Sequence, residues 1–392
     1  MALVLLKSTR RQFMKTAALI GSIIEGACSR TAPQNPQEAR AAKRSKLKAS
    51  LGKPIRYPVA GGDVWTTTWA DDDNLYSVSD DTSGFGKACD SNLALSRISG
   101  DSPSTLHGVT VNSMSEFGKA TESNKLDDAS WKASGLTCVD SVLYLAVSRH
   151  GYANDGGYSY LLQQTWDASI IKSEDHGKTW KGIPKVGQAM FPGHLFSDPF
   201  FVQYGKNGQG SKDGADEYVY ALSNDGIWNN GNWMTMGRVR RDQIANLNPH
   251  DWEFIQRFDK DRNPIWGPRY DTPRYVFRNP GRTSMTSIAY VSGLDLYLMP
   301  QWYYTHLDDA QHTMNATRLE FYYAPAPWGP WTLFHSQDSE PEGWYNPCIW
   351  SKFISDEGRK LWLSTSGLGP NFPTNSDAYC LTLVPVTVEE LS

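Results

Sequence analysis

The acidic residues between Gly62 and Asp81 have a spacing suited to acid–base chemistry. This segment reads as two alternating strands on either side of the polar turn Asp71-Asp72-Asp73-Asn74. Residues that face each other across such a hairpin have numbers that sum to about 144 or 145, which places Asp63 opposite Asp81 or its neighbour. Opposed residues have Cβ atoms roughly 5 Å apart. The sequence therefore predicts two carboxyl groups close together at the open end of this hairpin.

Two such carboxyl groups meet the requirement of glycoside hydrolysis. One carboxylic acid protonates the leaving oxygen, and a second carboxylate roughly 5 to 9 Å away acts as nucleophile or base. Two like charges so placed raise the pKa of one of them. Asp80 is an alternative to Asp81, because a register change of one residue turns the side chain to the other face. The competing interpretation is that these aspartates only cap turns, and Asp71 to Asp73 at the far turn are predicted to be solvated turn residues.

Five similar units that follow residue 55 would position these groups. Each opens with a strand, turns at a polar Gly, Asp or Asn cluster, and returns through a Tyr- or Leu-rich strand, without a long 3.6-residue stripe. The opening hairpins are Val64–Asp81, Trp131–Ser148, Ser197–Ser223, Ser284–Trp302 and Tyr345–Ser366. Repetition of this kind predicts an all-β fold, namely a five-bladed β-propeller.

Outer strands repeat as well and support the same fold. They are expected at Ala94–Ile98, Ser169–Ser173, Thr235–Val239 and Leu319–Ala324. The segment Ser173–Trp180 has the S-x-D-x-G-x-T-W pattern of an Asp-box, a turn in which Asp175 accepts backbone N–H bonds and Trp180 packs below it. An Asp-box indicates a propeller blade and is no evidence for catalysis, because it is expected on the outer rim.

The same hairpin geometry brings further side chains to the mouth of a central funnel. Arginine and histidine would bind sugar hydroxyls there, and Trp302 or Trp65 would stack on a sugar ring, although each residue taken alone also has a structural interpretation. The candidate substrate-binding residues are Trp65, Asp80, Arg149, His150, Asp198, Arg282, Trp302, Tyr345 and Asn346.

The N-terminal segment predicts export. Arg10-Arg11, followed by Phe13, Lys15 and the short apolar run from Ala17 to Ile24, resembles a twin-arginine signal. We expect a signal peptide over residues 1–28, a flexible tether over 29–54 and the propeller domain over 55–392, in a periplasmic, cell-surface or secreted protein. Cys28 follows small residues and would be a lipid anchor, the one membrane contact expected, although Glu25 departs from that pattern.

Composition narrows the class of partner. The net charge of −4 and the 20% of charged residues give no sign of a nucleic-acid surface. The 15 Trp, 19 Tyr and 14 Phe suit an all-β core, and most of these rings are expected to pack between sheets.

The cysteines give no sign of a metal site. No cysteine spacing typical of a zinc site occurs, and no cofactor is predicted, although the sequence does not decide whether a structural cation lies in the central channel. Besides Cys28, four cysteines permit two disulfides of unreadable pairing.

Several motifs together resemble a bacterial family first described as domain of unknown function 4185. They are Gly62–Trp69, Ser79–Phe85, Ala94–Arg97, Glu320–Trp331 and Tyr345-Asn346-Pro347, and the likeness covers nearly all of residues 55–390. Some members of that family are endo-D-arabinanases of glycoside hydrolase family 183, with five-bladed propellers and two catalytic aspartates in the first hairpin. The resemblance implies that Asp63 and Asp81 match that pair, and it leaves the substrate open.

Two functions therefore compete. The first is a glycoside hydrolase that cleaves a furanoside or another polysaccharide linkage with Asp63 and Asp81. The second is a non-catalytic, exported glycan-binding propeller. A sialidase, which the Asp-box also suggests, lacks an assignable arginine cluster to bind a carboxylate.

Overall fold

In a computed structural model of the protein, the described residues are 46–120, 129–152, 163–210, 217–272, 274–306, 316–340, 342–367 and 378–391. Strands dominate them, so the prediction of an all-β fold is confirmed. The helical elements among them are short 3-10 turns: η1 (Ser115–Phe117), η3 (His194–Phe196), η4 (Lys206–Gly208), η6 (Ile244–Asn246), η7 (Pro249–Asp251) and η8 (Ser351–Phe353). Within these residues, no helix is long and apolar enough to cross a membrane. The predicted signal peptide, the first part of the tether and Cys28 lie outside the described residues.

The strands follow one another in five antiparallel runs. Run 1 contains β2 (Ile55–Trp69), β3 (Leu75–Phe85), β4 (Ser91–Ser99) and β5 (His107–Asn112). Run 2 contains β6 (Ala129–Val139), β7 (Val142–Tyr152), β8 (Gln163–Ser173) and β9 (Phe191–Pro192). Run 3 contains β10 (Phe200–Gln203), β11 (Tyr218–Asn224), β12 (Gly231–Arg240), β13 (Trp252–Phe258) and β14 (Pro264–Gly267), with β15 (Phe277–Thr283) on the other part of β12.

The remaining strands complete the order. Run 4 contains β16 (Ile288–Val291), β17 (Leu296–Tyr304), β18 (Thr317–Ala324) and β19 (Thr332–Asp338). Run 5 contains β20 (Tyr345–Ile349), β21 (Lys360–Ser366) and β22 (Cys380–Leu391), with β1 (Lys46–Leu51) added at its edge. Each predicted opening hairpin is present, as β2–β3, β6–β7, β10–β11, β16–β17 and β20–β21. The predicted outer strands lie within β4, β8, β12 and β18.

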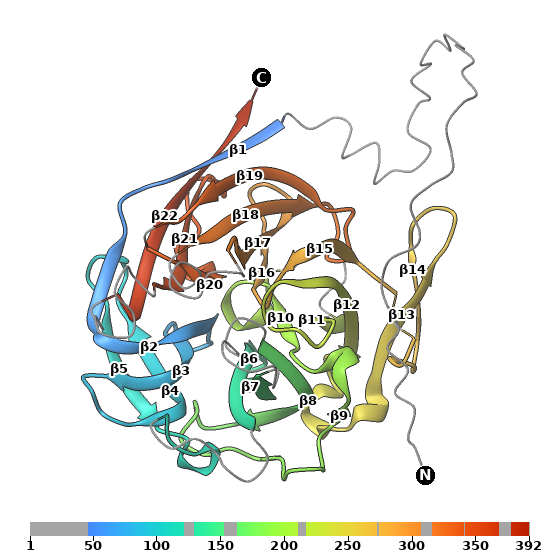
Figure 1. Ribbon diagram of the computed structural model, residues 1–392, viewed down its shortest axis with the longest axis horizontal. Helices are drawn as coiled ribbons and strands as arrows, with labels where there is room; N and C mark the ends of the chain where they lie inside the picture. Colours follow the sequence, from blue (N-terminus) through green and yellow to red (C-terminus); the bar gives the residue numbers. More distant parts are fainter. Residues whose placement is uncertain are drawn as a thin grey trace, which may run out of the picture.

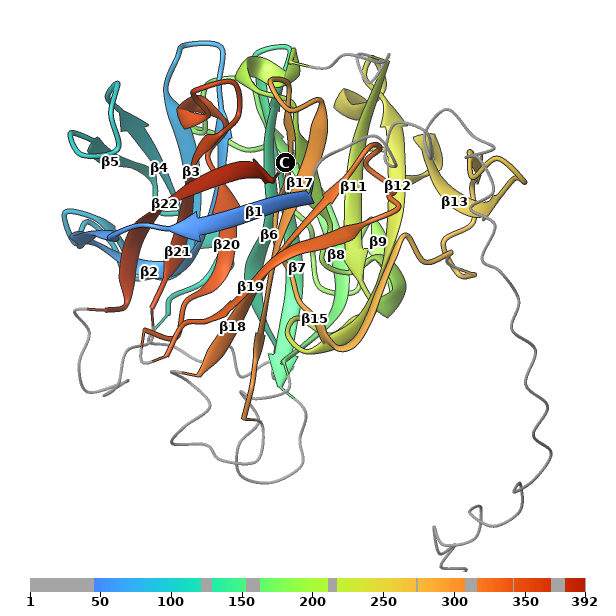
Figure 2. The same ribbon diagram turned by 90° about the horizontal axis from the view of Figure 1, so that it is seen from above.

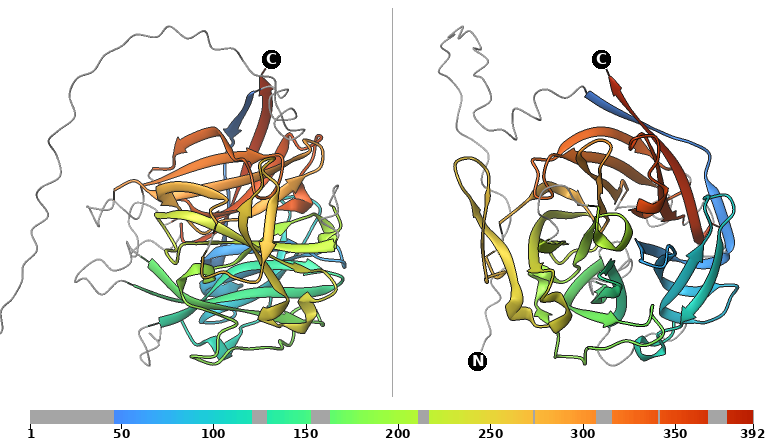
Figure 3. Two further views of the ribbon diagram at one scale, coloured as in Figure 1. Left: turned by 90° about the vertical axis from the view of Figure 1, so that its right-hand side faces the viewer. Right: turned by 180° about the vertical axis from the view of Figure 1, so that it is seen from behind.

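The first strands of the five runs form the centre of the molecule (Figure 1). β2 contacts β6, β6 contacts β10, β10 contacts β16, β16 contacts β20, and β20 contacts β2. Later strands of each run lie progressively farther out, as the view from behind also shows (Figure 3, right panel), and Figure 2 shows the same strands from above. β10 and β16 are parallel, so the open ends of their two hairpins face the same way.

Strands from the two ends of the described chain hold the first and last runs together. β22 lies between β21 and β2, so runs 1 and 5 share one sheet. β1 pairs with β22 from Lys46 to Leu51, and Leu47 and Ala49 are buried. The predicted start of the folded part near Ile55 is therefore too late, because the polar composition of this segment concealed a strand whose alternate residues are buried.

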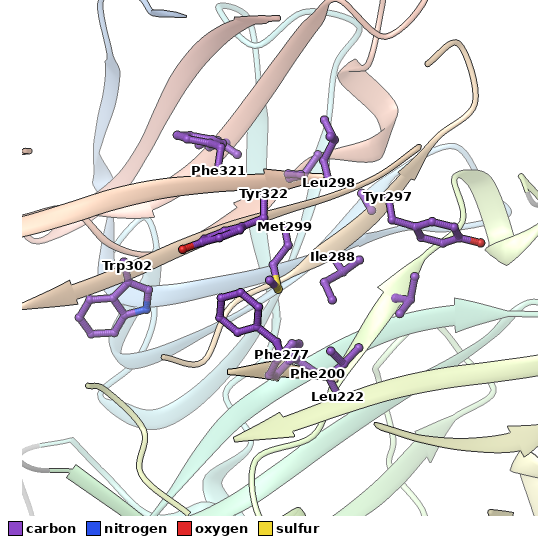
Figure 4. Packing of buried hydrophobic residues seen from close by; sticks show 14 of the residues in the cluster. Phe200, Leu222, Phe277, Ile288, Tyr297, Leu298, Met299, Trp302, Phe321 and Tyr322 are labelled. Carbon is purple, nitrogen blue, oxygen red and sulfur yellow. The ribbon is translucent and has the colours of Figure 1, made fainter. Parts of the chain in front are cut away.

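Apolar side chains fill the spaces between neighbouring runs. One cluster joins runs 3, 4 and 5 and includes Phe200, Leu298 and Trp302 (Figure 4). Smaller clusters lie between runs 1 and 2, runs 2 and 3, and runs 5 and 1. Aromatic rings such as Phe191, Phe196 and Phe254 pack edge to face in these layers, as expected for most of the rings in this sequence.

The Asp-box has the predicted hydrogen bonds. Asp175 accepts bonds from the Thr179 backbone N–H at 2.9 Å and the Thr179 hydroxyl at 2.7 Å, and Trp180 is buried nearby. His176 of this turn reaches the first hairpin, where its Nε2 lies 2.9 Å from Asp71 Oδ1. The turn aspartates are thus more than solvated turn residues, since Asp73 also pairs with Lys206 and Lys352 from other runs.

The cysteines of the described residues are not joined to one another. Cys89, Cys138, Cys348 and Cys380 form no disulfide there, so the two disulfides that the sequence permits are absent from this structure. Burial raises the pKa of the Cys138 thiol to about 12 and that of Cys348 to about 11, which makes both thiols unreactive at neutral pH.

Candidate functional site

The open end of the β2–β3 hairpin is distorted in the region of its aspartates. The pairing follows the predicted register from Trp69↔Leu75 to Thr66↔Val78, and it then shifts so that Asp63 pairs with Asp80. Val64, Trp65 and Asp81 have positive φ angles of 67°, 48° and 41°. Strained, bulged backbone of this kind concentrates at functional sites. Asp63 and Asp81 lie close enough at this bulge for the negative charge of Asp81 to raise the pKa of Asp63.

A glycine is required immediately before Asp63. Gly62 has a φ of +121°, and a Cβ atom there would lie 2.6 Å from Thr82 Cβ and 2.8 Å from Asp80 O. An L-residue would therefore clash with β3 and also adopt an unfavourable backbone conformation. Gly62 allows the two strands to approach closely where the carboxyl groups project.

Asp63 is half-buried, and its Oδ2 accepts hydrogen bonds from the hydroxyls of Tyr345 and Tyr379, the latter at 2.6 Å. Within the described residues, no bond is made to Oδ1. Burial and then the negative charge of Asp81 raise the pKa of Asp63 from 3.8 to about 6, against the opposing effects of Lys132 and the two hydroxyls. Asp63 is thus a carboxyl group whose pKa lies in the range suited to a general acid, which must still hold its proton near the working pH of the enzyme.

Asp81 has a different environment. Its Oδ1 lies 2.5 Å from the Nζ atom of Lys132, whose side chain is only 7% exposed, whereas that of Asp81 is 39% exposed. The ammonium group of Lys132 and the carboxylate of Asp81 therefore form an ion pair. Asp81 is therefore a solvent-accessible carboxylate beside a carboxyl group of raised pKa.

Asp80 does not take the place of Asp81. It is fully buried, and the Ala133 backbone N–H lies 3.1 Å from both of its oxygens. Burial raises the pKa of Asp80 well above its usual value, with Lys132 acting in the opposite direction and Asp63 adding to the rise. Asp80 joins β3 to β6 and has no exposed surface for a substrate, so its predicted substrate-binding role is not supported.

Sequence reasoning missed two residues of this site. Lys132 lies in β6 and is a single charge in the otherwise uncharged segment Trp131–Val139, a signal that could have identified it. Tyr379 lies just before β22, 316 positions from Asp63, and no local pattern distinguishes it.

The predicted residues of the second hairpin form the wall of the site. His150 is buried, its Nε2 lies 3.0 Å from Gln163 Oε1, and its ring packs against Trp228. Burial, with a contribution from the charge of Lys132, lowers the pKa of His150 to about 4, so it is neutral at physiological pH. Arg149 is mostly buried and forms an ion pair with Asp167 at 3.1 Å. Their existing contacts make both residues structural supports in this conformation.

Three other predicted side chains are fully buried. Trp65 donates its indole N–H to Gly62 O and Trp302 donates to Met285 O, at 3.0 and 2.8 Å. Neither ring has an exposed face, so the predicted stacking on a sugar is wrong for this structure. The bulge in β2 accounts for the direction of Trp65, and Trp302 packs in the cluster that joins runs 3, 4 and 5. Asp198 accepts bonds from Ser223 and Asn224, and burial raises its pKa to about 8.

Tyr345 and Asn346 of β20 do lie at the site. The pKa of the Tyr345 hydroxyl is raised well above its usual value, first by burial and then by the charge of Asp63, so it stays a hydrogen-bond donor. Asn346 has a φ of 50° and is 2% exposed, and its amide oxygen and nitrogen have no partner among the described residues. Arg282, the last predicted residue, is exposed and lies over the Tyr303 ring.

A group of potential metal ligands lies at the opposite end of the first hairpin. Ligand atoms of Asp71, Asp72 and His176 lie within 4.8 Å of one another. Hydrogen bonds already account for this arrangement, because Asp71 binds His176 and Asp72 binds Asn74 and Tyr76. The group is remote from Asp63, and it does not contribute to the candidate site.

Comparisons with known proteins give distant structural likenesses only. No family model and no curated protein sequence matches the chain. Among solved structures, the catalytic domain of a Coprinopsis cinerea family 62 α-L-arabinofuranosidase is 11% identical, with 88% of this chain and 97% of that one covered and a TM-score of 0.45. An endo-arabinase from Bacteroides thetaiotaomicron is 13% identical, with 86% and 97% covered and a TM-score of 0.42.

A third similar structure is a family 43 glycoside hydrolase from Bacillus licheniformis, at 11% identity. It has a TM-score of 0.46 over 86% of this chain and 57% of that one. Similarity at this level does not assign an activity or a substrate to this chain.

Proposed function

We propose that this protein is a glycoside hydrolase that uses Asp63 and Asp81 to cleave a glycosidic bond in a polysaccharide. One observation supports this most directly: at the open end of one hairpin, the half-buried Asp63 and the 39% exposed Asp81 have contrasting electrostatic environments. Such a pair supplies both the acid and the carboxylate that glycoside hydrolysis needs.

The environments suggest a role for each aspartate. Asp63 has a pKa raised to about 6, and its Oδ2 is held by two tyrosine hydroxyls, so a proton on Oδ1 can pass to the leaving oxygen. Asp81, which forms an ion pair with Lys132, acts as the second carboxyl group, which attacks the anomeric carbon or activates water. The tyrosines and Lys132 do not react; each of them opposes the rise in the pKa of Asp63.

The substrate and the setting form the finer part of the proposal. The motif resemblance to the endo-D-arabinanases of family 183 favours an arabinofuranosyl polymer as substrate. The cyclic contacts among β2, β6, β10, β16 and β20 support a five-bladed propeller. The twin-arginine pattern supports export to the periplasm, cell surface or medium, with Cys28 as the lipid-anchor candidate.

Incubation of the purified protein with D-arabinans, L-arabinans, other glycans and aryl furanosides tests the proposal. Released oligosaccharides would be measured by chromatography for the wild type and for Asp63→Asn, Asp81→Asn and the exposed control Asp101→Asn. We expect each site variant to lose at least about a hundredfold in turnover, the contribution typical of acid–base catalysis, while the control retains it.

A different outcome would favour the non-catalytic alternative. If the wild type binds a glycan but releases no product, and Asp63→Asn binds it equally well, the protein is a glycan-binding module. Turnover that survives both site substitutions would show that the reactive carboxyl groups lie elsewhere.

A further inference from the structure

A polar cavity lies at the open end of the β16–β17 hairpin, as Asp63 lies at the open end of the β2–β3 hairpin. It has a volume of about 530 Å³ and lies between the end of β15 and the ends of β17, β18 and β19. Volumes of this size are typical of sites for small organic ligands. The side chains used below are Asn230, Arg282, Tyr303, Tyr304, Arg318 and Asp338.

The cavity is adjacent to the aspartate site through packed aromatic rings. Tyr304 in the cavity wall contacts Trp302 at a centroid distance of 5.2 Å, and Trp302 contacts Tyr345 at 5.3 Å. Tyr345 in turn hydrogen-bonds to Asp63. A polymer with one linkage at Asp63 and Asp81 would therefore need to extend only a short distance across this face to reach the cavity.

The cavity wall is held in place before any ligand binds. Asn230 donates to Gly281 O at 3.0 Å and to Tyr304 O at 2.9 Å, and accepts from the Tyr304 N–H at 3.0 Å. These bonds connect the start of β12 with the ends of β15 and β17. Tyr303 is also fixed, because its hydroxyl donates to the buried Glu320 at 3.1 Å. Such preorganisation reduces the ordering cost of binding.

The charges in the wall favour a neutral ligand. Arg318 makes a two-point ion pair with Asp338, at 2.8 and 3.1 Å, which neutralises both groups. Arg282 and Glu340 carry one charge of each sign, so the lining has no net excess. Arg282 has no carboxylate partner within the described residues and lies 5.6 Å from the centre of the Tyr303 ring. Its guanidinium can donate to hydroxyl oxygens beside an aromatic surface, a combination that suits sugars.

We propose that this cavity is an accessory subsite for a neutral glycan chain. It binds sugar units that lie several units along the chain from the glycosidic bond held at Asp63 and Asp81. The link to cleavage rests on the proposed function; the glycan-binding role of the cavity does not. Occupancy of both positions by one chain favours attack within the polymer rather than at its terminal sugar.

Affinity measurements across a series of chain lengths test this subsite. Calorimetric titration would use Asp63→Asn, which prevents turnover, with linear arabinofuranosyl oligosaccharides from the disaccharide to the octasaccharide. Arg282→Ala in that background removes the unpaired guanidinium. Arg278→Ala, an exposed arginine on the same strand but outside the cavity, is the matched control. Circular dichroism of each variant checks that it is folded.

We expect Arg282→Ala to weaken binding of the longest oligosaccharide roughly three- to tenfold, the effect of one or two lost hydrogen bonds, and to weaken binding of the disaccharide less. Arg278→Ala should leave both affinities unchanged. Equal losses at every length, or no loss at any length, would overturn the subsite. Tighter binding of a uronic acid oligosaccharide that depends on Arg282 would overturn the neutral ligand class.

The two proposals fail in different ways. A wild type that hydrolyses glycans while Arg282→Ala shows no length-dependent loss keeps the hydrolase and rejects the subsite. A wild type without turnover whose affinity still grows with chain length and depends on Arg282 keeps the subsite and rejects the hydrolase.

Discussion

Substitution of Tyr345 by phenylalanine should raise the pKa of Asp63. The Tyr345 hydroxyl donates to Asp63 Oδ2 and stabilises the carboxylate form, so its loss favours the protonated form. A hydrogen bond to a charged group is worth about 1.5 to 3 kcal/mol, and one pKa unit corresponds to about 1.4 kcal/mol. Because Tyr379 keeps its own bond to the same oxygen, we expect the low end of this range, a rise of about one unit to about 7.

The rise should be visible in the pH dependence of activity. If Asp63 is the proton donor, kcat/KM decreases as the pH rises through its pKa, so the alkaline limb should move from about pH 6 to about pH 7 in Tyr345→Phe. The phenylalanine ring retains the packing against Trp302, and the fold should be unaffected. Tyr57→Phe, which removes a hydroxyl bound to Pro103 O, is the control and should leave the profile unchanged.

A measurement independent of turnover completes this test. Carbon NMR of the carboxyl groups, with the Asp63 signal assigned by its absence in Asp63→Asn, gives the pKa directly in both proteins. An unchanged or lower pKa in Tyr345→Phe would refute the hydrogen-bond reasoning. Titration of Asp63 near pH 4 in the wild type would refute the raised pKa and with it the assignment of Asp63 as the acid.

Two further predictions concern the scaffold. Burial raises the pKa of Asp198 to about 8, so between about pH 4 and pH 8 the folded state binds one more proton than the unfolded state. The folded state therefore loses about 1.4 kcal/mol of stability per pH unit over this range. Asp198→Asn should flatten this slope in denaturant titrations at several pH values, and an unchanged slope would contradict the shift. In Gly135→Ala, the new Cβ would lie 2.7 Å from Pro199 O and Phe200 Cα, which are backbone atoms of the next run. We expect the free energy of unfolding in urea to fall by about 1 to 3 kcal/mol. A variant as stable as the wild type would show that β6 and β10 are farther apart.

The elements that the sequence predicts well are those that local patterns specify. Alternation and polar turns locate all five inner hairpins, because each hairpin closes over a short stretch of chain. The strand β1 escaped prediction because its partner, β22, lies at the other end of the sequence. Lys48 and Ser50 on its exposed face made the segment resemble a polar tether, while Leu47 and Ala49 are buried.

The site was predictable to within one residue of register. Counting across the turn placed Asp63 near Asp81, and the structure pairs it with Asp80, because the chain bulges at Val64 and Trp65. That bulge also explains why Trp65 is buried instead of facing a ligand. Hydrophobic alternation in the sequence does not reveal a bulge, because a bulge changes the direction of the side chains without changing the order of the residues.

The contrast between the two aspartates depends on parts of the chain that lie far apart in the sequence and meet only in the folded structure. Lys132, which neutralises Asp81, comes from run 2, whereas the hydroxyls on Asp63 come from Tyr345 and Tyr379, 282 and 316 positions away in run 5. β22 pairs with β2 and fixes the position of Tyr379. If run 5 detached, Asp63 would lose both donors and part of its burial at once, which changes its pKa in opposite directions. The pKa of Asp63 therefore depends on the pairing of run 5 with run 1, and the β2–β3 hairpin alone would not produce the same pKa.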